Sequence, residues 1–196
     1  MTTPLRMDQT AVLQMLISSD SLRLSALGTV AALHLPDCWI GAGFVRDALW
    51  DHLHGYDVAD PIGDVDVIWY DAASPQPDVD RRIEQQLRDA MPKLCWSVKN
   101  QARMHLRNGD TPYTSVADAM RHWPETATAV AARLRLSGSI EFSAPHGLED
   151  LFALRLRPTP RFLTDKLPIF MNRVTSKRWL ERYPRLSLEL AAIGRP

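Results

Sequence analysis

Two aspartates in an otherwise apolar stretch are the residues of this sequence best suited to metal chemistry. The run Asp64-Val65-Asp66-Val67-Ile68-Trp69-Tyr70 is rich in β-branched and aromatic residues, which predicts a strand over residues 64–70. Residues two apart in a strand share one face, so Asp64 and Asp66 can converge on one divalent ion or on a pair of ions. Their mutual repulsion favours neutralisation by a cation. Mg²⁺ or Mn²⁺ suits a site with few oxygen ligands, because positions remain open for phosphate oxygens.

A glycine-containing turn upstream offers a place for phosphate. Gly41 and Gly43 lie between a short apolar run at 38–40 and a helical pattern over 44–53, which predicts a strand, a turn and a helix. Missing side chains let a phosphate approach the backbone N–H groups, and a helix N-terminus favours negative charge. Arg46, one turn into that helix, can reach the same anion. The alternatives are an ordinary tight turn here and two solvated carboxylates on an edge strand at Asp64 and Asp66.

Further elements must hold the turn and the acid pair together. Apolar periodicity and capping residues predict helices over residues 8–17, 21–33, 78–91, 115–122, 148–154 and 175–182, and strands over 94–98 and 139–142. Residues 126–134 are compatible with either element. A strand is preferred there because a third sheet member is needed to bury the first two. The order of elements predicts a mixed α+β fold.

The composition excludes several classes of protein. A chain of 196 residues with 45% hydrophobic residues can bury a core without a disulfide or a metal, so disorder is excluded as its main state. No apolar run approaches the roughly 20 residues of a bilayer span, and the first residues do not resemble a secretory leader. We therefore expect a soluble cytoplasmic protein without a membrane partner. Cys38 and Cys95 each adjoin a tryptophan and are expected to be buried, reduced thiols.

The charge is unevenly distributed although 23 basic residues balance 23 acidic ones. Residues 1–150 hold 13 basic and 20 acidic residues, whereas residues 151–196 hold 10 basic and 3 acidic ones. An anion would be drawn to the last quarter of the chain, where Arg155, Arg157 and Arg161 are candidates for contacts with phosphate; a solvated face is the alternative. We expect a single domain, residues 1–196, with N-terminal helices at 1–35, a core at 36–150 and a basic helical segment at 151–196.

At these residues the sequence resembles the nucleotidyltransferase superfamily of polymerase-beta-like enzymes. The superfamily signature is an apolar residue, Gly-Gly or Gly-Ser, a helical spacer, and then Asp-apolar-Asp-apolar on a strand. Its places are taken here by Ile40-Gly41-Ala42-Gly43-Phe44-Val45-Arg46-Asp47 and Gly63-Asp64-Val65-Asp66-Val67-Ile68. The runs 39–54, 98–105, 123–126 and 144–152 look more closely like a bacterial family of uncharacterised nucleotidyltransferase-like proteins, and this resemblance covers most of residues 36–190.

The resemblance implies a nucleotidyltransferase fold, a small mixed sheet flanked by helices, with a helical C-terminal segment. It implies transfer of a nucleoside monophosphate from a nucleoside triphosphate to an acceptor, which could be a small molecule, a protein or RNA. Asp64 and Asp66 would be catalytic and hold Mg²⁺ or Mn²⁺. The superfamily completes the site with a third carboxylate from another strand; Glu141 is the first candidate here, and Glu125 and Asp150 are the others.

The expected nucleotide and phosphate contacts come from two places in the chain. Gly41, Gly43 and Arg46 form the phosphate turn. Asn100 and Arg103 follow the end of a predicted strand, where the sites of α/β proteins commonly gather; loop capping is the alternative for both.

Two other functions stay open at this point. One is a catalytically inactive nucleotide-binding or protein-interaction module on the same fold. The other is a glycosyltransferase that uses Asp-x-Asp to hold a metal and a nucleotide sugar, which would need a longer nucleotide-binding sheet ahead of the motif. A third carboxylate within reach of Asp64 and Asp66 would distinguish an active transferase from an inactive module.

Overall fold

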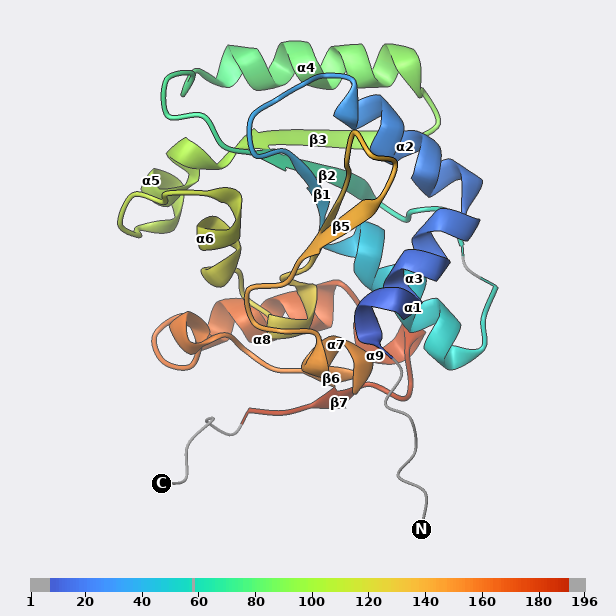
Figure 1. Cartoon of the computed structure of the whole chain (residues 1–196). Helices are drawn as coiled ribbons and strands as arrows, with labels where there is room; N and C mark the ends of the chain where they lie inside the picture. The colour runs from blue at the N-terminus through green and yellow to red at the C-terminus, as the bar shows by residue number, and fades with distance from the viewer. Residues whose placement is uncertain (1–7, 58, 191–196) are drawn as a thin grey trace.

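The fold is built around a five-stranded mixed sheet, seen in a computed structural model that describes residues 8–57 and 59–190 (Figure 1). The strands are β1 (Trp39–Gly41), β2 (Asp64–Trp69), β3 (Cys95–Asn100), β4 (Ala131–Leu134) and β5 (Ile140–Ser143). Their order across the sheet is β3-β2-β1-β4-β5. β2 and β3 run parallel, and the other neighbours are antiparallel. A separate parallel pair joins β6 (Arg155–Leu156) to β7 (Ser187–Leu188).

Helices surround this sheet. They are α1 (Gln9–Ser19), α2 (Ser21–Ala31), α3 (Gly43–His54), α4 (Pro77–Ala90), α5 (Met104–Asn108), α6 (Val116–Arg121), α7 (Glu149–Phe152), α8 (Leu167–Ser176) and α9 (Trp179–Arg182). Short 3₁₀ turns lie at Gln101–Arg103, Thr126–Thr128 and Pro160–Phe162. None of the helices in the described ranges has both the length and the apolarity needed to span a membrane.

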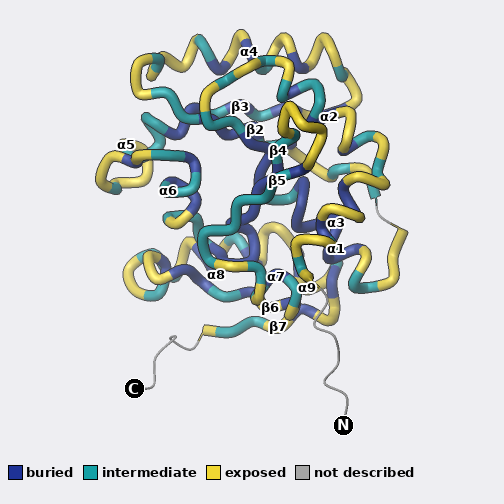
Figure 2. The backbone as a smooth tube through the Cα atoms, in the orientation of Figure 1, coloured by how far each residue is buried: buried dark blue, intermediate teal, exposed yellow. Residues whose placement is uncertain are grey.

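The two faces of the sheet have different coverings because strand residues alternate between them. One face of β2 presents Val65, Val67 and Trp69 to the main core, which also contains buried side chains of α1, α2, α3 and α4. On the other face, α6 packs over the row that contains Ile68. Figure 2 shows most of β2 as buried, whereas most of β5 is only partly buried. The face carrying Ile68 also carries Asp64 and Asp66, so the acid pair lies outside the main core.

α3 joins the C-terminal segment to the sheet. The indole N–H of Trp50 donates to the backbone oxygen of Leu151 at 3.1 Å, and its ring meets the rings of Trp179 and Tyr183 edge to face. The buried carboxylate of Asp51 accepts from the Tyr183 hydroxyl at 2.8 Å. Residues far apart in the sequence are therefore held against one helix.

Most of the predicted elements are confirmed, as is the mixed α+β class with a small mixed sheet flanked by helices. Asp8 caps α1 by accepting from the Thr10 N–H, and Ser115 caps α6 by accepting from the Asp118 N–H. These caps are local, since each side chain bonds a backbone group two or three residues away. That locality is why the sequence could predict the starts of both helices.

Three local predictions were wrong. The strand expected over 126–134 begins only at Ala131, because Thr126 to Thr128 form a 3₁₀ turn in which threonine hydroxyls bond to Glu125 and Asp150. The helix expected over 175–182 is two helices, α8 and α9, separated where Arg178 adopts a left-handed backbone with φ of 51°. Cys95, expected to be buried, is exposed as the first residue of β3, while Cys38 is partly buried; both are free thiols.

A close contact at Gly41 yields a testable prediction for the packing of the sheet. A Cβ at position 41 would lie 2.9 Å from the Trp123 ring and 3.2 Å from Ile68, so Gly41→Ala should lower the free energy of unfolding by about 1–3 kcal/mol. The control is Gly28→Ala within α2, where no atom lies within 4 Å of the added Cβ; that change should stabilise by about 0.5–1 kcal/mol. Urea unfolding measures both. Equal stability of Gly41→Ala and the native protein would contradict the contact.

Candidate functional site

Asp64 and Asp66 lie on the same face of the sheet as Gly41, the first residue of the glycine turn. Asp66 lies opposite Gly41 of β1 and opposite Ser97 of β3, and directly opposed residues in neighbouring strands share a face. Asp64 and Asp66, two residues apart in β2, share that face as well. Asp64 is exposed and Asp66 is partly buried. One carboxylate therefore opens to solvent while the other lies deeper beside it.

The surroundings of Asp66 show what the acid pair requires. Burial raises the pKa of the Asp66 carboxyl, and the negative charge of Asp64 raises it further. A hydrogen bond from Ser97 and the positive charges of Lys177 and Arg46 lower that pKa and offset only part of the rise. Ionisation of Asp66 is consequently less favourable than that of a free aspartate, and a cation held between the two carboxylates would favour it.

The turn beside the acid pair has an unusual backbone. The backbone of Ala42 has φ of 52° and ψ of −120°, a conformation that residues other than glycine rarely adopt. The Ala42 N–H donates to the Val130 backbone oxygen at 2.8 Å. Ala42 precedes α3 without capping it through a side chain, and its backbone oxygen accepts from the N–H groups of Val45 and Arg46. The preceding amides, at Gly43 and Phe44, are at the helix N-terminus, where an anion is favoured.

Arg46 is held rigidly near this turn. Its guanidinium pairs with Asp47 at 2.7 Å and lies over the rings of Trp50 and Trp179, 5.2 and 4.8 Å from their centroids. A Cβ on Gly43 would come within 3.3 Å of both the Arg46 guanidinium and the Asp47 carboxylate, so glycine leaves the room that this pair uses. The side chain of Arg46 is almost fully enclosed, which fixes its charge close to Asp66.

Gly41 has a different role from the one its position in the motif predicts. We expected its missing side chain to admit phosphate. The structure instead fills that space with the Trp123 ring, which could not lie so close to any larger residue. The space of the missing Cβ at Gly41 is therefore not open to a phosphate, and of the two glycines only Gly43 stays a candidate for such a contact.

The candidate third carboxylates lie in other interactions. Glu141 on β5 is two strands away from β1 and pairs with Arg133 and Arg135 at 2.7 and 2.6 Å, in contrast to the expectation that it would complete the acid pair. Over residues 8–57 and 59–190, no group of three or more acidic, histidine or cysteine side chains could hold a metal.

The other two candidates are also neutralised locally. Glu125 is fully buried and pairs with Arg173 at 2.7 Å. Asp150 accepts from the Thr126 hydroxyl at 2.7 Å and pairs with Arg157. A charged side chain that already has a cationic partner gains little from a distant metal.

Asn100 and Arg103 likewise do not join the acid pair. Asn100 lies opposite Trp69, on the face turned to the main core, and its amide binds the backbone of Asp71, Ser74 and Ala102. Arg103 pairs with the buried Asp80. The expectation of nucleotide contacts from these two residues is corrected to loop anchoring, because every polar group of the Asn100 amide is used within the protein.

The basic C-terminal segment contributes through a residue that the sequence did not single out. Arg155 and Arg157 pair with Glu189, and Arg161 pairs with Asp110. Lys177, the exposed residue that ends α8, is instead the one whose charge acts on Asp66. The excess of positive charge after residue 150 was the signal for this region, but only the folded chain shows which cation faces the acids.

The residues present fit a single Mg²⁺ or Mn²⁺. Mg²⁺ is commonly held by one or two carboxylates while phosphate oxygens and waters fill the remaining positions. Asp64 and Asp66 supply such a pair on one face, and burial together with the charge of Asp64 raises the pKa of Asp66. Asp64 and Asp66 are therefore the residues that would hold the ion.

A mixed sheet with an acid pair on the strand beside a helix-opening turn defines the polymerase-beta-like class of nucleotidyltransferases. A family model described as nucleotidyltransferase matches residues 28–188. The chain belongs to this nucleotidyltransferase family.

Solved structures agree with the family. An NMR structure described as a CCA-adding enzyme head domain shares 32% identity, with a TM-score of 0.82 over 91% of this chain and 95% of that one. The Bacillus stearothermophilus CCA-adding enzyme in complex with CTP shares 21% identity at a TM-score of 0.53, over 87% of this chain and 41% of that one. The Thermotoga maritima CCA-adding enzyme complexed with tRNA shares 15% identity at 0.55, over 91% and 42%.

The likeness to the two longer enzymes is one of fold. The chain spans about two fifths of their length, and both are under 25% identical to it. A comparison with curated proteins gives no match.

The raised pKa of Asp66 predicts a gain of stability when the charge is removed. The pKa of Asp66 is higher in the folded protein than in the unfolded chain. The contribution of Asp66 to the free energy of unfolding is therefore largest below the unfolded pKa, and it is lost as the pH rises through the folded pKa. In the presence of a chelator, Asp66→Asn should therefore unfold at a higher urea concentration than the native protein at pH 7. The difference should shrink towards about pH 4, near the ordinary pKa of an aspartate.

The matched control is Asp78→Asn on α4, where the carboxylate is exposed beside Arg81. That variant should not gain stability at pH 7. A loss of stability in Asp66→Asn at pH 7 would show that its ionised form is favoured in the fold.

Proposed function

We propose that the protein transfers a nucleoside monophosphate from a nucleoside triphosphate to an acceptor, with Mg²⁺ or Mn²⁺ held by Asp64 and Asp66. The observation that carries this proposal is the position of two carboxylates on one face of β2 beside the turn that opens α3, with the charges of Arg46 and Lys177 acting on Asp66. The family and the head-domain likeness support nucleotidyl transfer in general. The assignment to particular residues rests on the geometry around Asp66.

The chain's own groups would bind and orient the triphosphate. The amides at Gly43 and Phe44 open α3 and would donate to phosphate oxygens. Arg46, fixed between two indole rings, would neutralise charge on the same group, and Lys177 would do so from the end of α8. The ion bound by Asp64 and Asp66 would supply charge neutralisation at the α-phosphate and alignment of the acceptor oxygen. Catalysis would come from position and electrostatics.

A specific observation favours a second candidate, a nucleotide-binding module without transfer activity. Glu141, Glu125 and Asp150 each have a cationic partner away from the acid pair, so no third carboxylate of the described residues joins it. If the site takes the acceptor proton, Asp64 is the exposed carboxylate that could accept it. Binding without turnover would identify the inactive module.

The chemical class of the acceptor is to be determined by experiment. The classes to compare are a small molecule, a protein and RNA. CTP is the first nucleotide to test because a solved structure of similar fold contains it. Transfer RNA is a reasonable first RNA for the same reason.

Calorimetry with each of the four ribonucleoside triphosphates and Mg²⁺ tests the proposed site. We expect saturable binding of at least one triphosphate to the native protein. Chelation, or Asp64→Asn combined with Asp66→Asn, should weaken it by about tenfold or more, because charge-assisted contacts contribute about 1.5–3 kcal/mol.

Asp78→Asn combined with Asp89→Asn is the control, since both residues are exposed on α4 and the change in charge is equal. Equal affinity of the double variant and the native protein would disprove the metal site. Absence of binding to all four triphosphates would disprove both candidate functions.

Lys177 provides a separate prediction for the phosphate contacts. Lys177→Gln should weaken triphosphate binding by about tenfold and weaken nucleoside monophosphate binding much less, because we propose that Lys177 lies beside the distal phosphates. Lys93→Gln, an exposed lysine before β3, is the control and should leave both affinities unchanged. Equal losses for the two nucleotides would place Lys177 away from the distal phosphates.

A further inference from the structure

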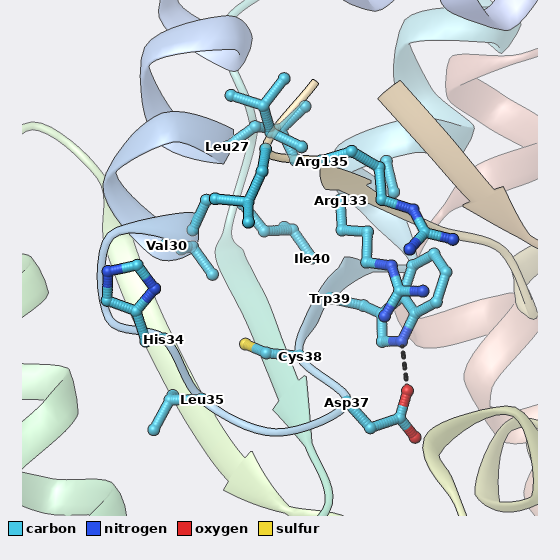
Figure 3. Close-up of a pocket in the computed structure, with 14 residues that line it drawn as sticks. Leu27, Val30, His34, Leu35, Asp37, Cys38, Trp39, Ile40, Arg133 and Arg135 are labelled. Carbon is cyan, nitrogen blue, oxygen red and sulfur yellow. Dashed lines mark hydrogen bonds between the residues drawn. The ribbon is translucent and has the colours of Figure 1, made fainter. Parts of the chain in front are cut away.

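A cavity of about 280 Å³ lies at the other end of β1 from the acid pair (Figure 3). Its walls come from the end of α2, the connection between α2 and β1, β1 itself, and β4 with the first residues of the turn that follows it. β1 and β4 pair at Ile40 with Ala132 and at Gly41 with Ala131, and both Ile40 and Ala132 line the cavity. Neither Asp64 nor Asp66 contributes to it. The cavity is therefore distinct from the proposed nucleotide site.

The inner wall of the cavity is apolar. It is formed by side chains that belong to the main core or border it, namely Leu27, Val30, Ile40, Ala132 and Leu134. Cys38 adds a thiol whose pKa burial raises to about 12, so the sulfur stays neutral at physiological pH. A ligand would contact an apolar inner wall that carries no charged side chain and no reactive thiolate.

Two guanidinium groups form one side of the opening. Arg133 and Arg135 both bond to the same oxygen of Glu141, at 2.7 and 2.6 Å, so two guanidinium groups share one carboxylate. Arg133 also lies over the Trp39 ring, 4.0 Å from its centroid. In the described part of the chain, the hydrogen bonds of Arg133 and Arg135 to side chains all involve their Nε atoms, which leaves their terminal amino groups to an outside acceptor.

Asp37, the carboxylate beside the cavity, is hydrogen-bonded to groups other than the two arginines. Asp37 accepts from the Trp39 indole N–H at 2.8 Å and from the Val116 N–H at 2.7 Å, so both of its oxygens are occupied (Figure 3). The Asp37 carboxylate thus fixes Trp39 under Arg133. Among the charged groups that line the cavity in the described residues, the two arginines keep unused hydrogen-bond donors for a ligand.

From this combination we infer that the cavity is a binding site for a small organic anion, a carboxylate or a phosphate monoester with an apolar body. The apolar wall would cover the body of the ligand, and the terminal nitrogens of Arg133 and Arg135 would bind the anionic group in a forked contact. The volume lies at the lower limit of small-molecule pockets, which suits a ligand well below the size of a nucleoside triphosphate. This site lies beyond the proposed nucleotidyl transfer and does not depend on it.

Three probes of similar shape test the inference on the full chain. Benzoate and phenyl phosphate carry the two anionic groups, and benzamide is the neutral isostere of benzoate. Titration followed by the ¹H–¹⁵N signal of the Trp39 indole gives a local readout, because that N–H lies beneath Arg133. We expect saturable shifts at about millimolar concentrations for at least one anion and at least about tenfold weaker binding of benzamide. The anion that binds more tightly identifies the headgroup.

Two variants separate the charge from the cavity. Arg135→Gln removes a cation from the exposed rim, and Ala31→Leu fills space at the end of α2 without a change of charge. Each should weaken binding of the anion by about tenfold. Arg81→Gln, an exposed arginine paired with Asp78 on α4, is the control and should bind as the native protein does.

Three results would overturn the inference. They are no saturable shift with either anion, equal affinity for benzoate and benzamide, and unchanged affinity in both Arg135→Gln and Ala31→Leu. Thermal unfolding of each variant confirms that it is folded, and Arg135→Gln changes only a surface side chain, so a loss of binding there reports the charge.

Discussion

The burial of one carboxylate beside another on a single strand face is the constraint on which the arrangement of charges around this site depends. Asp66 lies beside Asp64 with little solvent to screen its charge, and its raised pKa records that cost. Two positive charges lower the pKa of Asp66. They belong to Arg46 on α3 and to Lys177 at the end of α8. These cations reduce the cost without removing it. In the proposed complex, a divalent ion bound with a triphosphate would neutralise the negative charge of Asp64 and Asp66 that Arg46 and Lys177 leave uncompensated.

α3 is the element that makes this arrangement possible. Its first turn opens beside the acid pair, while Asp47 fixes Arg46 at 2.7 Å and Asp51 binds the Tyr183 hydroxyl. The contacts of Trp50 with Trp179 and Tyr183 bring the C-terminal segment against the same helix. Arg182, which pairs with Asp51, adds a charged link between the two parts. The basic end of the chain therefore serves the site by packing on α3, and most of its arginines balance acids elsewhere.

The short strand β1 divides the molecule into two chemically different regions. Gly41 at one end lies opposite Asp66, and Trp39 at the other end lies below Arg133. The first region carries the acid pair, whereas the second places two guanidinium groups beside an apolar cavity. Glu141 belongs to the second region, where it holds Arg133 and Arg135 together. Its carboxylate is thereby committed to the arginines at the cavity and not to a metal beside Asp64.

The sequence by itself determined the elements whose signals are local. β-Branched residues around Asp64 and Asp66 identified β2, Asp8 and Ser115 identified helix starts, and the glycine turn followed by Arg46 identified the opening of α3. Only the tertiary structure decided which distant groups face the acid pair. The sequence could not show that Lys177 acts on Asp66, that Trp123 fills the space at Gly41, or that Asn100 binds loop backbone. Those outcomes depend on how strands pair and on which charges meet across the fold, and neither is encoded in the spacing of neighbouring residues.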